Sequence, residues 1–263
     1  MRIFNEGIDN GKAFDWGLAS ADYAKYRDIY PDIFYQKVIE MGLCLKGQRV
    51  LDIGTGTGVL PRNLYKYGAE FVGADISENQ IIQARRLSDE AGMNIAYIVS
   101  PAEEISFPDN HFDVVTACQC YDYLDKDAIF SKMQKLLKPA GCFCILYVAY
   151  LPGESEIAFM SEQLVLKYNP CWSGSGALRY TYEFPKQAAG LFEVEKSFCY
   201  DVSIPFTRES WNGRMKACRG IGASELSFEE ISKWEEEHIA YMRSVPQEFD
   251  IPHFVTVLNL RSM

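Results

Sequence analysis

The chain has 263 residues, of which 48% are hydrophobic and 24% are charged. This composition is that of a globular protein and excludes a disordered chain, a collagen-like repeat or a disulfide scaffold. The net charge of −10 disfavours a nucleic-acid partner, because proteins that follow a phosphate backbone carry a basic stripe.

Neither secretion nor membrane insertion is expected from the sequence. Residues 1–15 lack the basic start and apolar run of a signal peptide, and no apolar stretch approaches the ~20 residues that cross a bilayer. The eight cysteines form no CxxC pair and only three histidines are present, so we predict reduced thiols and no metal site. These features predict a cytoplasmic protein with no membrane partner. They leave a monomer and a homodimer equally open.

The first half of the chain alternates between strand and helix patterns. A helical stretch over 20–41 is interrupted at Pro31, and Gly68 is expected to end the helix that precedes it. Ser77 is expected to cap a later helix, with Gln80 at the capping-box position. The expected strands are 49–53, 71–74, 95–99, 112–117 and 142–148, and the expected helices are 58–67, 77–91 and 126–137. Short apolar strands alternating with helices predict a parallel sheet covered on both faces.

The second half has a different character. Residues 151–190 are rich in Tyr, Trp, Gly and Pro, and strand-like segments are expected over 192–206 and 252–260. Helices are expected over 207–218 and 227–242, capped by Thr207 and Ser227. The second of these helices is acidic, so His238 within it is expected on the surface. We predict one structural domain, in which residues 1–150 form the cofactor-binding core with N-terminal covering helices. Residues 151–263 then supply the last strands together with a lid or substrate region.

A glycine-rich turn joins the first expected strand to the next helix. It reads Asp52-Ile53-Gly54-Thr55-Gly56-Thr57-Gly58. Glycines permit positive φ and close approach of a ligand, and the following helix offers unpaired N–H groups. Asp75 ends the next strand, where an acidic side chain hydrogen-bonds ribose hydroxyls in related folds. The third glycine falls one place too early for the dinucleotide fingerprint, which disfavours an oxidoreductase.

This loop, preceded by Asp52, resembles that of the class I methyltransferases that depend on S-adenosylmethionine (SAM). Residues 101–115 and 135–141 look like further motifs of the broad small-molecule, methyltransferase type 11-like subgroup, and residues 23–27 look like its cofactor-covering helix. The resemblance implies an α/β, Rossmann-like fold with a mostly parallel seven-stranded sheet and helices on both faces. It also implies SAM as cofactor and S-adenosylhomocysteine (SAH) as product.

The resemblance further implies which residues contact the cofactor: Tyr26, Arg27, Asp52, Gly54, Thr55, Gly56, Gly58, Asp75, Ile76, Ala102, Glu103 and Gln119. The loop would lie under the methionyl part, with Asp52 facing its amino group. Asp75 would bind the ribose, and the three residues Ile76, Ala102 and Glu103 would surround the adenine. Gln119 would lie near the methyl donor, and Tyr26 or Arg27 would reach the carboxylate. Many relatives have Asp in place of Pro101, so adenine recognition falls here to the neighbours of Pro101.

Catalytic residues are harder to assign, and four candidates stay open. Tyr121 and Asp122 follow the fourth strand, where they would wall the acceptor pocket and orient a nucleophile, or else form an ordinary polar loop. Arg208 begins an arginine-rich helix that would bind a carboxylate or simply face solvent. His253, which opens the last expected strand, is a candidate general base.

The predicted function is methyl transfer from SAM to a small molecule, which needs mainly positioning of the two partners and exclusion of water. The first alternative is a non-catalytic SAM-binding sensor or scaffold, because binding and catalytic residues largely coincide in this fold. A nucleotide-dependent oxidoreductase is the weaker alternative. The sequence does not identify the acceptor.

Overall fold

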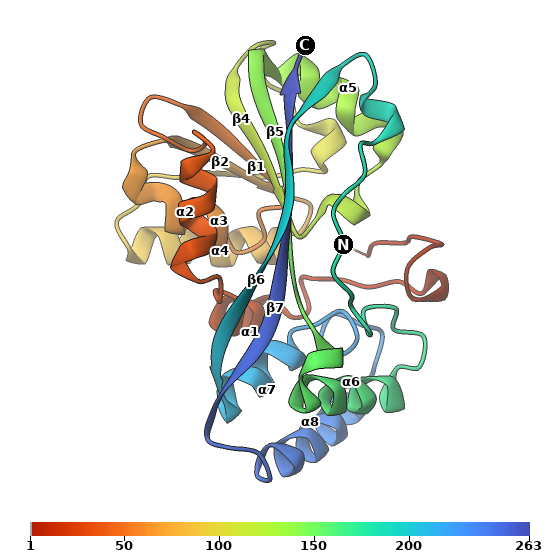
Figure 1. Cartoon of the computed structure of the whole chain (residues 1–263). Coiled ribbons are helices and arrows are strands. Elements are labelled where there is room, and N and C mark those ends of the chain that lie inside the picture. Colours follow the sequence, from red (N-terminus) through yellow and green to blue (C-terminus); the bar gives the residue numbers. More distant parts are fainter. Residues whose placement is uncertain (1) are drawn as a thin grey trace. The chain divides into compact units, whose positions relative to one another are not determined.

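The computed structural model describes residues 2–263 and shows the expected alternation of strands and helices (Figure 1). The helices are α1 (Ser20–Tyr26), α2 (Asp32–Glu40), α3 (Val59–Leu64), α4 (Glu78–Glu90), α5 (Lys126–Leu136), α6 (Glu156–Tyr168), α7 (Arg208–Lys216) and α8 (Phe228–Met242). The strands are β1 (Arg49–Ile53), β2 (Glu70–Asp75), β3 (Ala96–Val99), β4 (Phe112–Cys118), β5 (Leu137–Tyr150), β6 (Phe192–Thr207) and β7 (Glu248–Ser262).

The strands form one seven-stranded sheet in the order β3-β2-β1-β4-β5-β7-β6. The pairs β1–β2, β2–β3, β1–β4 and β4–β5 are all parallel. The strand order reverses between β1 and β4, which is the switch point where ligands bind in open α/β sheets. The predicted α/β, Rossmann-like fold with a mostly parallel seven-stranded sheet is therefore confirmed.

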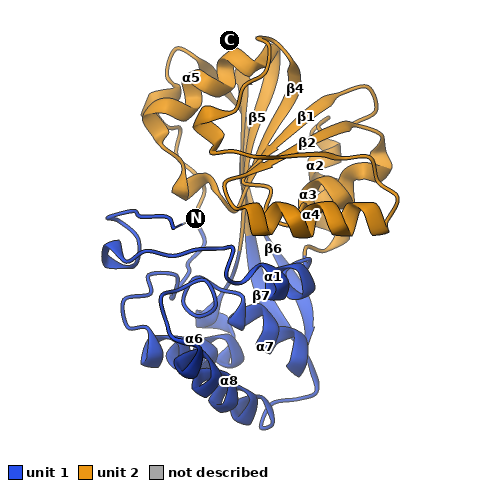
Figure 2. Ribbon diagram, turned by 180° about the vertical axis from the view of Figure 1, so that it is seen from behind, with its two compact units in different colours: residues 1–29, 149–179, 201–254 blue, residues 30–148, 180–200, 255–263 orange. Residues whose placement is uncertain are grey.

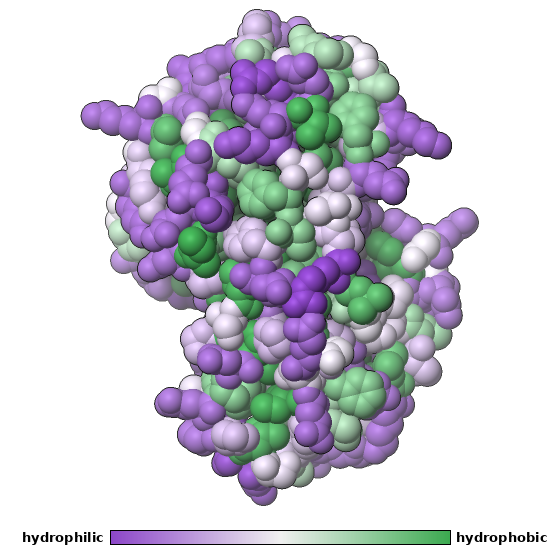
Figure 3. All heavy atoms as spheres, in the orientation of Figure 1, coloured by the Kyte–Doolittle hydropathy of each residue, from purple (hydrophilic) through white to green (hydrophobic). Residues whose placement is uncertain are grey.

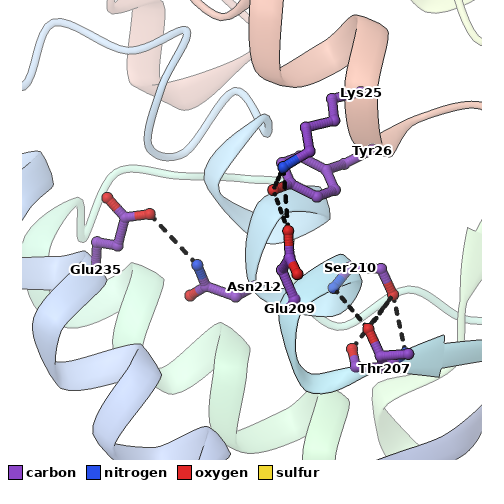
Figure 4. Close-up of polar contacts among 7 residues, drawn as sticks. All are labelled: Lys25, Tyr26, Thr207, Glu209, Ser210, Asn212 and Glu235. Carbon is purple, nitrogen blue, oxygen red and sulfur yellow. Dashed lines mark hydrogen bonds and ion pairs between the residues drawn. The ribbon is translucent and has the colours of Figure 1, made fainter.

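Several local predictions are confirmed, and others need correction. Gly68 ends the helical segment after β1 with a φ of 85°. Thr207 and Ser227 both close capping boxes, and Figure 4 shows the contacts between Thr207 and Ser210. Ser77 occupies the N-cap position of α4, but its side chain makes no capping hydrogen bond. Strand β5 is longer than expected because it continues through residues 139–141, where Ala140 adopts a φ of 60°.

The chain divides into two compact units, coloured separately in Figure 2. Unit 1 consists of residues 1–29, 149–179 and 201–254, and unit 2 consists of residues 30–148, 180–200 and 255–263. The core of unit 2 is built on buried side chains of the sheet and α5, among them Leu51, Phe112, Phe130 and Phe143. The division into a core and a lid region at residue 150 stays a prediction.

Unit 1 contains a buried polar network around His238, which the acidic character of α8 had led us to place on the surface. His238 is 0% exposed, and burial lowers its pKa to about 4, so the ring is neutral. Its Nδ1 lies 2.7 Å from Asn212 Oδ1 and therefore carries the proton. Its Nε2 lies 2.9 Å from Ser161 Oγ, which accepts from Trp211 Nε1 at 2.9 Å and donates to Ile157 O at 2.7 Å.

Hydrophilic residues cover most of the face drawn in Figure 3, with hydrophobic atoms in smaller groups between them. Within residues 2–263, no helix combines the length and apolar character needed to cross a membrane.

Candidate functional site

The glycine-rich loop lies at the carboxyl end of β1, in unit 2. Gly54, Gly56 and Gly58 have φ values of 60°, 55° and 75°, the left-handed region that favours glycine. The Thr55 N–H donates to Ala74 O at 2.9 Å, which ties the loop to β2. A Cβ added at Gly54 would lie 2.4 Å from Cys120 Cβ, so glycine is needed for packing as well as for backbone conformation. Gly54 and Gly56 remain half-exposed, which leaves their backbone open to a ligand.

Asp52 fixes the loop through hydrogen bonds of its side chain. Its side chain is buried, and its two carboxylate oxygens accept from Thr55 Oγ1 and Thr116 Oγ1, both at 2.6 Å. Burial raises the pKa of Asp52 to about 6, although both hydroxyl donors oppose the rise. Sequence reasoning missed Thr116. Asp52 and Thr116 are paired across β1 and β4, so their contact can be predicted only once the register of these two strands is known.

Asp75 ends β2 beside the same loop. One carboxylate oxygen accepts from the Gly56 N–H and the other from the Ser77 N–H, each at 2.8 Å. Burial raises the pKa of Asp75, and these two backbone donors oppose the rise. Each carboxylate oxygen has a second lone pair, so Asp75 can also accept from the hydroxyls of a bound ribose. Its geometry fits the predicted role.

The residues expected around the adenine also lie in unit 2. Ile76 follows Asp75, and Ala102 and Glu103 lie in a 3-10 turn, Ala102–Glu104. The Glu103 carboxylate accepts from the Asp125 N–H at 2.9 Å, so it is already engaged with the turn before α5. Pro101 has no N–H, so it cannot donate a backbone hydrogen bond at this position, and the adenine contacts of its neighbours stay a prediction.

Gln119 follows β4 with a φ of 67°, an uncommon conformation for a residue other than glycine. Its N–H donates to Leu146 O at 2.9 Å and its Nε2 donates to Val148 O at 2.6 Å, so two hydrogen bonds to β5 hold it there. The next residue, Cys120, packs on Gly54 and donates from Sγ to Ile53 O at 3.0 Å. The turn after β4 is therefore attached directly to the glycine loop.

Two catalytic candidates occur in this turn. Tyr121 and Asp122 belong to the 3-10 segment Tyr121–Tyr123, in which Tyr121 is buried and Asp122 is exposed. Lys126 Nζ lies 3.8 Å from the centroid of the Tyr121 ring. The structure therefore brings both candidates to the edge of the sheet where the glycine loop lies.

The remaining predicted residues belong to unit 1, so their roles stay predictions. Tyr26 OH donates to Glu209 Oε1 at 3.0 Å and also contacts Lys25, as Figure 4 shows. Arg27 lies over the Tyr23 ring, 5.0 Å from its centroid.

Arg208 and His253 each have a defined local environment. Arg208 Nε donates to Val245 O at 2.9 Å, which engages part of its guanidinium. His253 is 1% exposed, and its Nδ1 donates to Ile251 O at 2.8 Å. Burial lowers its pKa to about 3, so the ring is neutral and its Nε2 is an acceptor. That makes His253 a weak base on its own.

All eight cysteines are free thiols. Among residues 2–263, no group of three or more His, Cys, Asp or Glu side chains is arranged to hold a metal ion.

The part of the chain that carries these residues is similar to known proteins. Residues 50–141, which include the glycine loop, Asp75 and the turn after β4, match the family model described as a methyltransferase domain. The ubiquinone biosynthesis O-methyltransferase of Azorhizobium caulinodans is 31% identical over 127 residues, 48% of this chain and 50% of that protein. The ubiquinone/menaquinone biosynthesis C-methyltransferase UbiE of Shewanella frigidimarina is 35% identical over 137 residues, 47% of this chain and 54% of that protein. The chain thus spans about half the length of these relatives.

Similarity of fold extends further along the chain. A solved protein of Bacillus halodurans C-125, assigned to the methyltransferases, superposes with a TM-score of 0.53 over 86% of this chain and 97% of its own, at 17% identity. At this identity the match concerns the fold alone.

Proposed function

We propose that this chain, whose core is a class I SAM-dependent methyltransferase domain, transfers a methyl group from SAM to a small-molecule acceptor. The observation that carries the proposal is the joint geometry of the glycine loop, Asp52 and Asp75 at one edge of the parallel sheet. Positive φ at three glycines opens the loop backbone to a ligand, and a carboxylate with spare acceptor capacity lies beside it.

When bound, SAM supplies a methyl group on a positively charged sulfonium sulfur. The residues of this chain would bind and orient it. The half-exposed backbone at Gly54 and Gly56 would contact the methionyl part, and Asp75 would accept from the ribose hydroxyls. Asp52 would keep the loop in place through Thr55 and Thr116 rather than react itself. Methyl transfer is a single displacement, so positioning and exclusion of water supply most of the catalysis.

The acceptor is proposed only as a small molecule. The two relatives bear names of quinone biosynthesis, but each alignment covers only about half of this chain. Free thiols at all eight cysteines support the predicted cytoplasmic location, because such thiols persist in reducing compartments.

The proposal is tested by measuring SAH formation with purified protein, SAM and three acceptor panels: phenols and quinols, amines, and thiols. We expect SAH above the acceptor-free rate with at least one panel, and loss of this signal in the Asp75→Ala variant. The Gly92→Ala variant is a suitable control, since Gly92 lies after α4 with nothing within 4 Å of an added Cβ. A folded protein that binds SAM but forms no SAH with any panel would favour the sensor or scaffold alternative.

A further inference from the structure

Four tyrosine rings come together in unit 2 from three separate parts of the chain. Tyr121 lies in the turn after β4, Tyr147 lies near the end of β5, and Tyr180 and Tyr182 lie before β6. The ring centroids of Tyr121 and Tyr182 are 5.3 Å apart and those of Tyr180 and Tyr182 are 5.2 Å apart, both edge to face. Tyr147 and Tyr180 are 6.0 Å apart. We call these four residues the tyrosine cluster.

The tyrosine cluster adjoins the glycine loop. Cys120, the residue before Tyr121, packs on Gly54, and its Sγ donates to Ile53 O. On the other side, the Gln119 N–H donates to Leu146 O, the residue before Tyr147. Tyr121 and Tyr147 therefore each follow directly, in the sequence, a residue that makes a contact of the candidate cofactor site. One ring of the cluster is accessible, since Tyr180 is 37% exposed, whereas Tyr121 is buried.

Asp122 gives the tyrosine cluster a negative charge. Burial raises the pKa of Tyr121 to about 12, and it also raises the pKa values of Tyr180 and Tyr182. The nearby Asp122 carboxylate adds to the rise in all three. The phenols are therefore neutral at physiological pH, and their electron-rich faces lie within the field of an exposed carboxylate. Aromatic faces of this kind attract cations, most effectively when several rings share one site.

A cation already occupies part of this environment. Lys126 Nζ lies 3.8 Å from the Tyr121 ring centroid, and it donates to Tyr121 O and to Leu124 O, the latter at 3.3 Å. Burial lowers the pKa of Lys126, while Asp122 opposes this. The ammonium is thus held by two backbone carbonyls, and the contact shows that the face of Tyr121 accepts a positive charge.

We propose that the tyrosine cluster and Asp122 bind the methyl acceptor, and that this acceptor is an amine. The inference rests on the proposed methyl transfer. The amine binds as an ammonium ion and loses one N–H proton to Asp122 or to water. Its nitrogen lone pair then forms the N–CH3 bond while the S–CH3 bond breaks and its electron pair returns to sulfur, which leaves neutral SAH. The product is again an ammonium ion.

The charge distribution favours this acceptor over a phenol. During N-methylation, positive charge moves from sulfur to nitrogen, and ring faces with a carboxylate stabilise positive charge where it develops. A phenol reacts as an anion. Asp122 would repel that anion, and Lys126 directs two of its three N–H groups to backbone carbonyls.

Binding is tested first without turnover, by calorimetry on the full chain saturated with SAH. The probe is choline, and the matched control ligand is 3,3-dimethylbutan-1-ol, which has the same shape without the charge. We expect choline to bind and the neutral alcohol to bind at least about tenfold more weakly. Equal binding of the two, or binding of neither by protein that does bind SAH, would overturn the inference.

Variants separate the ring faces from the hydroxyl groups. Tyr180→Phe keeps the aromatic face and should retain choline binding, whereas Tyr180→Leu and Asp122→Asn should each weaken it several-fold. Because Tyr180 and Asp122 are partly or fully exposed, these substitutions leave the core intact, and circular dichroism would check this. Equal affinity in Tyr180→Phe and Tyr180→Leu would contradict a role for the ring.

Activity then distinguishes failure of the inference from failure of the proposed function. SAH formed with primary or secondary amines and not with phenols supports the inference. SAH formed with phenols or thiols only would overturn it while leaving the proposed methyl transfer in place. SAH formed with no acceptor would overturn both.

Discussion

Replacing Gly54 by alanine should damage the candidate site more than the same change at any open glycine. Two costs add. A φ of 60° costs a residue with a Cβ about 1–2 kcal/mol. The new Cβ would also lie 2.4 Å from Cys120 Cβ and 2.7 Å from Cys120 Sγ, and such overpacking costs about 1–3 kcal/mol. We therefore expect a loss of about 2–5 kcal/mol in the free energy of unfolding.

The matched control is Gly92→Ala. Gly92 has a φ of 64°, close to that of Gly54, but nothing lies within 4 Å of its added Cβ. Gly92→Ala should therefore lower the free energy of unfolding only through backbone strain, by about 1–2 kcal/mol. Denaturant titration of both variants, monitored by circular dichroism, measures the difference between their free energies of unfolding. The double variant Gly54→Ala/Cys120→Gly removes the atoms in conflict and should recover part of the loss. Equal destabilisation by Gly54→Ala and Gly92→Ala would refute the packing argument.

Three further predictions concern buried polar groups. The pKa of Asp52 is about 6 in the folded chain against 3.8 for an ordinary Asp, so its ionisation opposes folding. The free energy of unfolding should therefore fall by up to about 3 kcal/mol as the pH rises from 4 through 6. Asp52→Asn should flatten this part of the pH profile in denaturant titrations, and an unchanged slope would contradict the assignment. Thr116→Val removes a donor to Asp52 and should cost about 1–3 kcal/mol, whereas Thr116→Ser should cost less; equal losses would show that the hydroxyl does not matter. Ser161→Ala removes the partner of both Trp211 Nε1 and His238 Nε2 and should lower the free energy of unfolding by about 2–4 kcal/mol. Denaturant titration monitored by tryptophan fluorescence measures this, and a loss below about 0.5 kcal/mol would contradict the network.

The sequence was sufficient for the parallel half of the fold because its signals are local. Apolar strands, the glycine loop and the stop at Gly68 each depend on a few adjacent residues. The same local reasoning misplaced His238, since the acidic residues of α8 masked the buried positions Trp234, His238 and Met242, spaced four residues apart along one face.

The parts of the site that the sequence did not reveal depend on distant residues. Thr116 reaches Asp52 only through the register of β1 against β4. Tyr182 contacts Tyr121 from a segment about 60 residues further along the chain, in a region with no regular periodicity, and Tyr180 contacts Tyr182. Strand β5 begins at Leu137 and continues through residues 139–141, where Ala140 takes a positive φ and the pairing with β4 shifts register. That irregularity depends on the neighbouring strand and could not be predicted locally.

Calorimetric titration of SAM and SAH into the purified chain, beside the Asp75→Ala variant, tests the central claim most directly. Asp75 should contribute a charge-assisted hydrogen bond to the ribose, and such bonds contribute about 1.5–3 kcal/mol. We expect micromolar binding of both ligands to the unaltered chain and affinity that is at least about tenfold weaker in the variant. A well-folded chain that binds neither SAM nor SAH would contradict the account.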